Sequence, residues 1–138
     1  MKKVSVIMPA YNADKYISDS INSVLNQSYK NIELIIVDDK STDNTAQIAQ
    51  YYASMYPNIK VIINSENSLA GYSRNVGVYH SSGEYIAFID ADDIYREDYL
   101  EKLVKAIEES EANISMCQHR CFIGRRQPTR DKSSGKVT

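Results

Sequence analysis

Acidic side chains gather at two places in this sequence of 138 residues. Asp38 and Asp39 follow one apolar run, and Asp90, Asp92 and Asp93 follow another. Carboxylates that lie close together raise one another's pKa unless a cation or hydrogen-bond donors compensate. Their hard oxygen atoms suit Mg²⁺ or Mn²⁺, which complete their coordination with phosphates and water. The residue types therefore predict a divalent metal and a diphosphate ligand.

The second acidic segment has a D-x-D spacing. On an extended chain this spacing puts Asp90 and Asp92 on the same side, while Asp93 points elsewhere. An EF-hand calcium loop is excluded because Ile94 stands where a third acidic ligand is needed and no glycine follows it. One alternative stays open, in which these carboxylates serve only as turn and helix-capping groups.

Strands that alternate with helices must position these residues. Short, β-branched apolar runs predict strands over residues 4–8, 34–37, 60–63, 84–90 and 113–123. Apolar residues at helical spacing predict helices over residues 13–27, 46–55, 69–80 and 96–109. Asn12 or Asp14 is expected to cap the first helix, and the cluster Ser41-Thr42-Asp43 the second. The order indicates an α/β fold with a mostly parallel, twisted sheet and helices on both faces.

The carboxyl ends of the strands are where ligands bind in open α/β sheets. Three predicted strands end in candidate groups, namely Pro9-Ala10-Tyr11-Asn12, Asp38-Asp39-Lys40-Ser41 and Asp90-Ala91-Asp92-Asp93. We therefore expect the aspartates of both acidic segments at one edge of the sheet.

Composition excludes several classes of partner. Sixteen Lys and Arg stand against eighteen Asp and Glu, a net charge of -2, so we expect no nucleic acid partner. No apolar run approaches the roughly 20 residues needed to cross a bilayer, so we expect no transmembrane segment, while peripheral membrane association stays open.

Cys117 and Cys121 lie in a segment predicted to be extended, too far apart for a disulfide. The lack of a disulfide favours a cytoplasmic location, and a location at the inner face of the membrane stays open.

Four segments, in this order, resemble the family 2 glycosyltransferases with the GT-A fold. They are VSVIMPAYN at 4–12, VDDKSTDNT at 37–45, SRNVG at 73–77 and GEYIAFIDADD at 83–93. The resemblance runs from about residue 3 to residue 123. It implies a GT-A (Rossmann-like) α/β/α sandwich that binds a nucleotide-diphosphate sugar, expected to be a UDP-sugar. It also implies inverting transfer to a saccharide or lipid-linked acceptor, as in polysaccharide biosynthesis.

The resemblance also implies residue roles. Ala10 and Tyr11 would line the nucleoside pocket, and Asp39 would accept a hydrogen bond from the N–H of a uracil or thymine base. The full donor-binding set is Pro9, Ala10, Tyr11, Asn12, Asp38, Asp39, Arg74, Asp90 and Ala91, with Asp92 as the ligand of Mg²⁺ or Mn²⁺. Asp90 would lie near the ribose and Arg74 would face the diphosphate or the sugar. Two alternatives stay open: Asp38 as a strand-end carboxylate satisfied by backbone donors, and Arg74 as an exposed helix arginine.

The general base that inverting transfer needs has no counterpart in this sequence. Family members carry it in a later acidic motif, which residues 113–138 lack, and Glu108, Glu109 and Glu111 end a surface helix. We expect residues 1–123 to form a donor-binding domain that is only part of such an enzyme. Residues 124–138 form a basic polar tail, either flexible or the start of an acceptor-side region.

Two other functions compete with this interpretation. A non-catalytic module could hold a nucleotide sugar with the same residues. A phosphoacceptor receiver domain also carries paired aspartates, but there the pair follows the first strand, whereas Asp38 and Asp39 follow the second.

Cys117, His119 and Cys121 share one face of the last predicted strand, yet the outer two lie about 13 Å apart, too far for one zinc ion.

Overall fold

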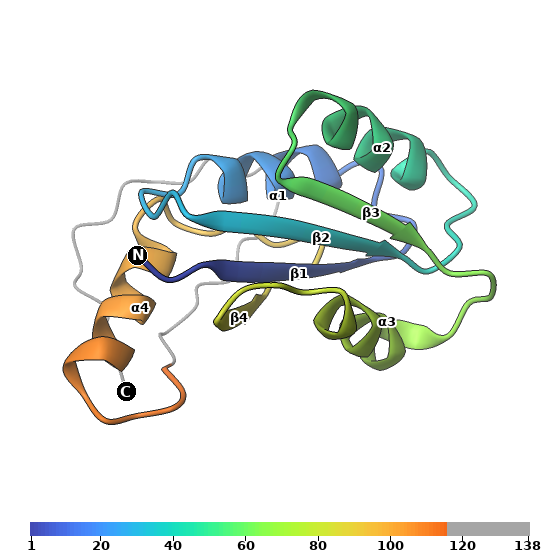
Figure 1. Ribbon diagram of the computed structural model, residues 1–138. Helices are drawn as coiled ribbons and strands as arrows, with labels where there is room; N and C mark the ends of the chain where they lie inside the picture. The colour runs from blue at the N-terminus through green and yellow to red at the C-terminus, as the bar shows by residue number, and fades with distance from the viewer. Residues whose placement is uncertain (116–138) are drawn as a thin grey trace.

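The computed structural model describes residues 1–115, in which strands and helices alternate from the first element to the last (Figure 1). The strands are β1 (Val4–Ala10), β2 (Ile32–Asp38), β3 (Ile59–Ile63) and β4 (Tyr85–Phe88). The helices are α1 (Ile17–Leu25), α2 (Thr45–Met55), α3 (Leu69–Tyr79) and α4 (Tyr99–Glu109). The α/β fold expected from the sequence is confirmed.

The four strands form one sheet in the order β3-β2-β1-β4, and every neighbouring pair is parallel. Helices α1 and α2 cover one face and α3 covers the other (Figure 1). Every residue of β1 and β2 is buried, because a central parallel strand has a helix layer on each side. This is why these two strands are nearly continuous in apolar character.

The two faces of the sheet have separate apolar cores. The larger core joins β1 and β2 to α1, α2 and α4 through residues such as Ile21, Leu34 and Leu100. The smaller one consists of Ile7, Ile35 and Val37, with Val76 of α3 packed against them. Helix α3 lies close to β1 at Gly77, where an added Cβ would stand 2.3 Å from Cγ2 of Ile7.

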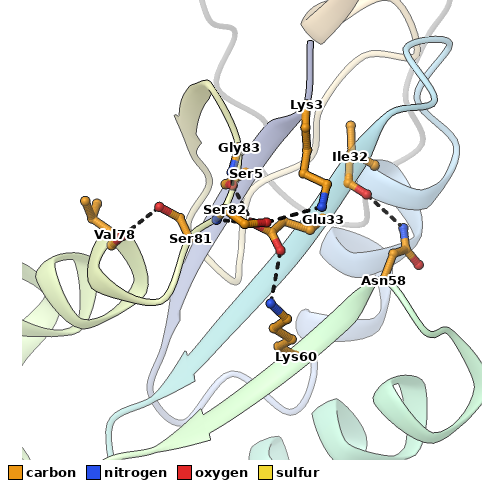
Figure 2. A network of polar contacts seen from close by, with 10 residues as sticks. All are labelled: Lys3, Ser5, Ile32, Glu33, Asn58, Lys60, Val78, Ser81, Ser82 and Gly83. Atoms are coloured by element: carbon orange, nitrogen blue, oxygen red, sulfur yellow. Dashed lines mark hydrogen bonds and ion pairs between the residues drawn. The ribbon is translucent and has the colours of Figure 1, made fainter. Parts of the chain in front are cut away.

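A buried carboxylate attaches the connection between α3 and β4 to the sheet (Figure 2). Oε1 of Glu33 accepts hydrogen bonds from Oγ of Ser5 and from the backbone N–H of Ser82, both at 2.6 Å. Its Oε2 lies 3.3 Å from Nζ of Lys60. Burial alone would raise the pKa of Glu33, but the hydrogen bonds from Ser5, Ser82 and Lys60 outweigh it and lower the pKa to about 2.

Several predicted boundaries are wrong. Helix α1 begins at Ile17 rather than residue 13, and neither Asn12 nor Asp14 caps it, because both side chains bind the loop before α2 instead. Strand β4 ends at Phe88, before the predicted residue 90. Residues 113–115 are not a strand. The rest of the predicted strand over 113–123, with Cys117, His119 and Cys121, and the tail at 124–138 lie outside the described residues.

Over residues 1–115, no helix combines the length and apolar character that a membrane span requires.

Candidate functional site

The sheet order brings the three predicted segments together, since β2, β1 and β4 are adjacent and parallel. Their carboxyl ends therefore lie at one edge. The backbone N–H of Asp39 donates to the carbonyl of Ala10 at 2.8 Å, so the ladder between β1 and β2 continues to the start of both loops. Pro9 and Ala10 are buried there, whereas Tyr11 is 51% exposed.

The loops after β1 and β2 are hydrogen-bonded to each other through Asn12. Its backbone N–H donates to Oγ of Ser41 at 3.0 Å, and its Oδ1 accepts from the N–H of Thr42 at 2.8 Å. Asn12 has a φ of 47°, in the left-handed region that asparagine tolerates better than most residues. The contact fixes both loops relative to each other. The side-chain oxygen of Asn12 is therefore used in a contact within the protein.

Asp38 lies at the end of β2 with only 1% of its surface exposed. Its Oδ2 accepts from the N–H of Ser41 at 2.9 Å, and its Oδ1 accepts from Oγ of the same serine at 2.6 Å. These contacts are those of a carboxylate that closes a turn. The alternative that the sequence left open was a carboxylate satisfied by backbone donors, and one of the two donors here is a backbone N–H.

Asp39 makes a different set of contacts. Its Oδ1 accepts from Nδ2 of Asn64 at 3.0 Å and from the N–H of Ser68 at 2.8 Å, and its Oδ2 accepts from the N–H of Leu69 at 2.8 Å. Burial acts to raise the pKa of Asp39, but the hydrogen bonds from Asn64, Ser68 and Leu69 together lower it. Asp39 is thus an ionised acceptor with fixed orientation at the N-terminus of α3.

The acidic segment after β4 is a tight turn and not an extended chain. The N–H of Asp93 donates to the carbonyl of Asp90 at 3.0 Å, and Oγ of Ser20 lies 2.8 Å from the carbonyl oxygen of Ala91. The prediction that Asp93 points away from Asp90 and Asp92 is therefore wrong. Each of the three exposed aspartates offers a carboxylate oxygen within 4.8 Å of the other two. This set of hard oxygen donors fits Mg²⁺ or Mn²⁺.

Arg74 of α3 reaches the acidic turn. Its Nη2 lies 3.2 Å from Oδ1 of Asp90, and the two side chains are 42% and 51% exposed. An exposed pair of this kind contributes little to stability, on the order of 0–1 kcal/mol. The pair does, however, place a guanidinium beside a cluster of carboxylates.

The glutamates at the end of α4 lie far from this edge. Glu108 accepts from the hydroxyl of Tyr85, the first residue of β4, at 3.4 Å, and lines a hollow together with Lys2 and Glu84. These neighbours belong to the amino ends of the strands. That Glu108 is a poor substitute for the general base stays a prediction.

Sequence reasoning missed Asn64, which contacts Asp39 and is 8% exposed. The signal was available, because Asn64 directly follows the predicted third strand. The rule that ligands bind beyond strand carboxyl ends applies to this strand as well as to the other three.

Comparisons with known proteins give consistent relatives. The family model described as "Glycosyl transferase family 2" matches residues 5–135. TuaG of Bacillus subtilis, described as a putative teichuronic acid biosynthesis glycosyltransferase, is 46% identical over 106 residues, which cover 77% of this chain and 42% of TuaG. Among solved structures, S. aureus TarS in complex with UDP-GlcNAc has a TM-score of 0.78 at 34% identity, covering 92% of this chain and 37% of that one.

A second similar solved structure is that of the mannosyltransferase PcManGT of Pyrobaculum calidifontis in complex with GDP-Man and Mn²⁺. It has a TM-score of 0.70 at 28% identity, over 74% of this chain and 31% of that one. The chain therefore spans less than half the length of each of these relatives.

Proposed function

The chain belongs to glycosyl transferase family 2, and on that premise we propose that residues 1–123 form the donor-binding domain of an inverting, metal-dependent enzyme of polysaccharide biosynthesis. The proposal rests mainly on the contact between Arg74 and the carboxylate cluster of Asp90, Asp92 and Asp93 at the carboxyl edge of the sheet. Positive and negative groups side by side at such an edge suit a diphosphate that arrives with a divalent cation.

The donor that we propose is a UDP-sugar. The similarity to TarS, which was solved with UDP-GlcNAc, supports this choice. Asp39 is the acceptor for the N–H of the base, a hydrogen bond that a carboxylate makes with uracil and that cytosine cannot supply at its ring nitrogen. Ala10 and Tyr11 line the nucleoside pocket, with Pro9 and Asn12 shaping the loop that carries them. PcManGT was solved with GDP-Man, so relatives differ in the base that they bind, and side chains must decide it.

Arg74 binds the diphosphate. Asp90 lies near the ribose, with Ala91 beside it. Asp92 is the main ligand of Mg²⁺ or Mn²⁺, and the turn brings Asp93 within reach as well. The Mn²⁺ in the PcManGT complex supports this assignment. Such a cation, when bound, neutralises charge on the leaving diphosphate. Asp38, in contrast, acts by holding the loop that presents Asp39.

Transfer also requires a base that takes the proton of the acceptor hydroxyl. Within the described residues we assign none, because Glu108 and its neighbours lie at the opposite edge. We propose that residues 124–138 lead into an acceptor-side region that supplies the base and binds a saccharide or lipid-linked acceptor.

A calorimetric panel tests the nucleotide base, the metal and the role of Asp92 together. UDP, dTDP, GDP and CDP are titrated into the wild type and Asp92→Ala, each in Mn²⁺ and in EDTA. We expect UDP to bind the wild type about tenfold or more tightly in Mn²⁺ than in EDTA, the equivalent of one contact to a charged group. Asp92→Ala should lose most of this difference.

The control is Asp19→Ala, which removes an exposed carboxylate from α1. It should keep the metal dependence of the wild type. Equal UDP affinities for the wild type and Asp92→Ala under both conditions would overturn the metal assignment.

A further inference from the structure

The carboxylate of Asp39 is almost saturated by donors of the chain itself. A carboxylate offers about four acceptor positions, two on each oxygen. Among residues 1–115, Nδ2 of Asn64 and the N–H of Ser68 both donate to Oδ1, while only the N–H of Leu69 donates to Oδ2. One position therefore remains, and it belongs to Oδ2.

The amide of Asn64 is held in this orientation. Its Nδ2 also donates to Oγ of Ser73 at 3.0 Å, so both hydrogens of the amide nitrogen are used. Its backbone N–H donates to the carbonyl of Asp38 at 2.8 Å. Ser73 is fully buried in α3, and rotation of the amide would leave buried polar groups without partners. Asn64 thus occupies Oδ1 of Asp39 persistently.

The saturation of one oxygen restricts which base the carboxylate accepts. Uracil, thymine and hypoxanthine each present a single ring N–H between their neighbouring groups, and one free position on Oδ2 satisfies it. Guanine presents an N–H and an adjacent amino group, which together pair with both oxygens of a carboxylate. At Asp39 the amino group would meet an oxygen already taken by Asn64 and Ser68, and a donor buried without a partner is costly.

We propose that Asn64 is a specificity-determining residue, which limits the nucleotide base at Asp39 to one with a single N–H donor and thereby disfavours guanine nucleotides. This inference rests on the proposed function, since it takes Asp39 as the acceptor for the base. It goes further in assigning the choice of base to a residue outside the four segments that resemble the family.

Inosine and guanosine diphosphates provide the test, because they have the same ring size and differ in the amino group. Both are measured by calorimetric competition against UDP, in Mn²⁺, for the wild type and Asn64→Ala. We expect the wild type to prefer IDP over GDP. Asn64→Ala opens a position on Oδ1, so the preference for IDP should fall by about tenfold, the value of one hydrogen bond to a charged group.

Asn58→Ala is the matched control. Asn58 lies at the other end of β3, where its Nδ2 donates to the carbonyl of Ile32 at 3.3 Å, and its removal should leave the ratio of IDP to GDP affinity unchanged. Ser73→Ala is a second variant. It keeps Asn64 but releases its amide, and should shift the ratio in the same direction by a smaller factor.

The outcomes separate the two proposals. If the wild type does not bind UDP, the proposed function fails and this inference fails with it. If the wild type binds UDP and a folded Asn64→Ala keeps the wild-type ratio, only the inference is overturned. If Asn64→Ala does not fold, Ser73→Ala decides, and an unchanged ratio in that variant overturns it.

Discussion

Two adjacent aspartates at the end of β2 do different work because their carboxylates meet different donors. Asp38 receives both of its hydrogen bonds from Ser41, three residues later, and so closes a local turn. Asp39 receives its bonds from Asn64, Ser68 and Leu69, which come from another strand end and from the start of α3. The first contact stabilises a loop. The second links the loop to the helix that carries Arg74, so Asp39 and Arg74 are positioned together.

Glu33 predicts how the stability of the protein depends on pH. Its pKa in the folded state is about 2, below the ordinary 4.5, so the unfolded chain takes up the proton first. The stabilisation is therefore complete above about pH 5 and is lost as the pH falls toward 2. We expect Glu33→Gln to lower the free energy of unfolding at pH 7 by roughly 1–3 kcal/mol, because the amide loses the charge and, with its oxygen toward Ser5 and Ser82, turns its NH2 donor toward Lys60.

Urea unfolding at pH 7, 5 and 3 checks this prediction. The gap between the wild type and Glu33→Gln should shrink by roughly half or more at pH 3, where the unfolded wild type is already protonated. Glu109→Gln, which changes an exposed carboxylate of α4, is the control and should leave the curve unchanged. A gap of equal size at all three pH values would show that Glu33 acts through shape and not through charge.

Among the elements, α3 connects the parts of the site. Its N-terminus binds Asp39, Ser73 holds Asn64, and Arg74 reaches Asp90. Its distance from the sheet depends on Gly77, which lies against Ile7, a fully buried side chain that is β-branched and therefore stiff. A change in that distance should therefore move all three contacts together.

Gly77→Ala tests this role of α3. The added methyl would stand 2.3 Å from Cγ2 of Ile7, so either the helix or the side chain of Ile7 must shift. We expect a loss of about 1–3 kcal/mol in the free energy of unfolding and weaker UDP binding. Gly71→Ala, on the same helix, should instead raise stability by up to about 1 kcal/mol, since no atom of residues 1–115 lies within 4 Å of the added Cβ. Urea unfolding and calorimetry measure both effects, and equal behaviour of the two variants would contradict the steric argument.

The sequence predicted the alternation of strands and helices because each element carries its own periodicity. The paired strands β1 and β2 are nearly continuous in apolar character, and the apolar stripe of α1 repeats at helical spacing. The polar contacts between loops could not be predicted in this way. Asn12 looked like a helix cap but binds Thr42, 30 residues away, and no local pattern distinguishes the two. The turn at Asp90 escaped prediction for a related reason, since Ser20 of α1 binds the carbonyl of Ala91 within it.

At the scale of the whole molecule, the two ends of the parallel sheet differ in chemistry. The carboxyl edge holds Asp39, Arg74 and the acidic turn, whereas the amino edge holds Glu33 with Lys60 and the glutamates at the end of α4. A carboxylate at the amino edge is separated from a ligand at the carboxyl edge by the length of the strands. Among the described residues, the groups that we assign to the donor thus lie at one edge and the glutamates of α4 at the other.

The last prediction concerns activity: the 138-residue chain should bind a UDP-sugar but transfer its sugar poorly. A missing base alone costs about 10² to 10⁴ in rate. We assign no acceptor site to residues 1–115, and its loss should cost more, because the orientation of two reactants supplies several kcal/mol of barrier lowering. Slow hydrolysis of the donor can persist, since water needs no dedicated pocket.

The measurement compares this chain with a longer version that includes the coding sequence downstream of residue 138, using radiolabelled UDP-sugars and a mixed pool of acceptors. Donor affinity should be similar in the two, because the groups that we assign to the donor all lie before Ile94. Transfer should be faster in the longer version by at least about 10². If neither version transfers sugar while both bind the donor, the non-catalytic module is the better description. Efficient transfer by the shorter chain would place the base within residues 1–138 and would reassign Glu108, Glu109 or Glu111.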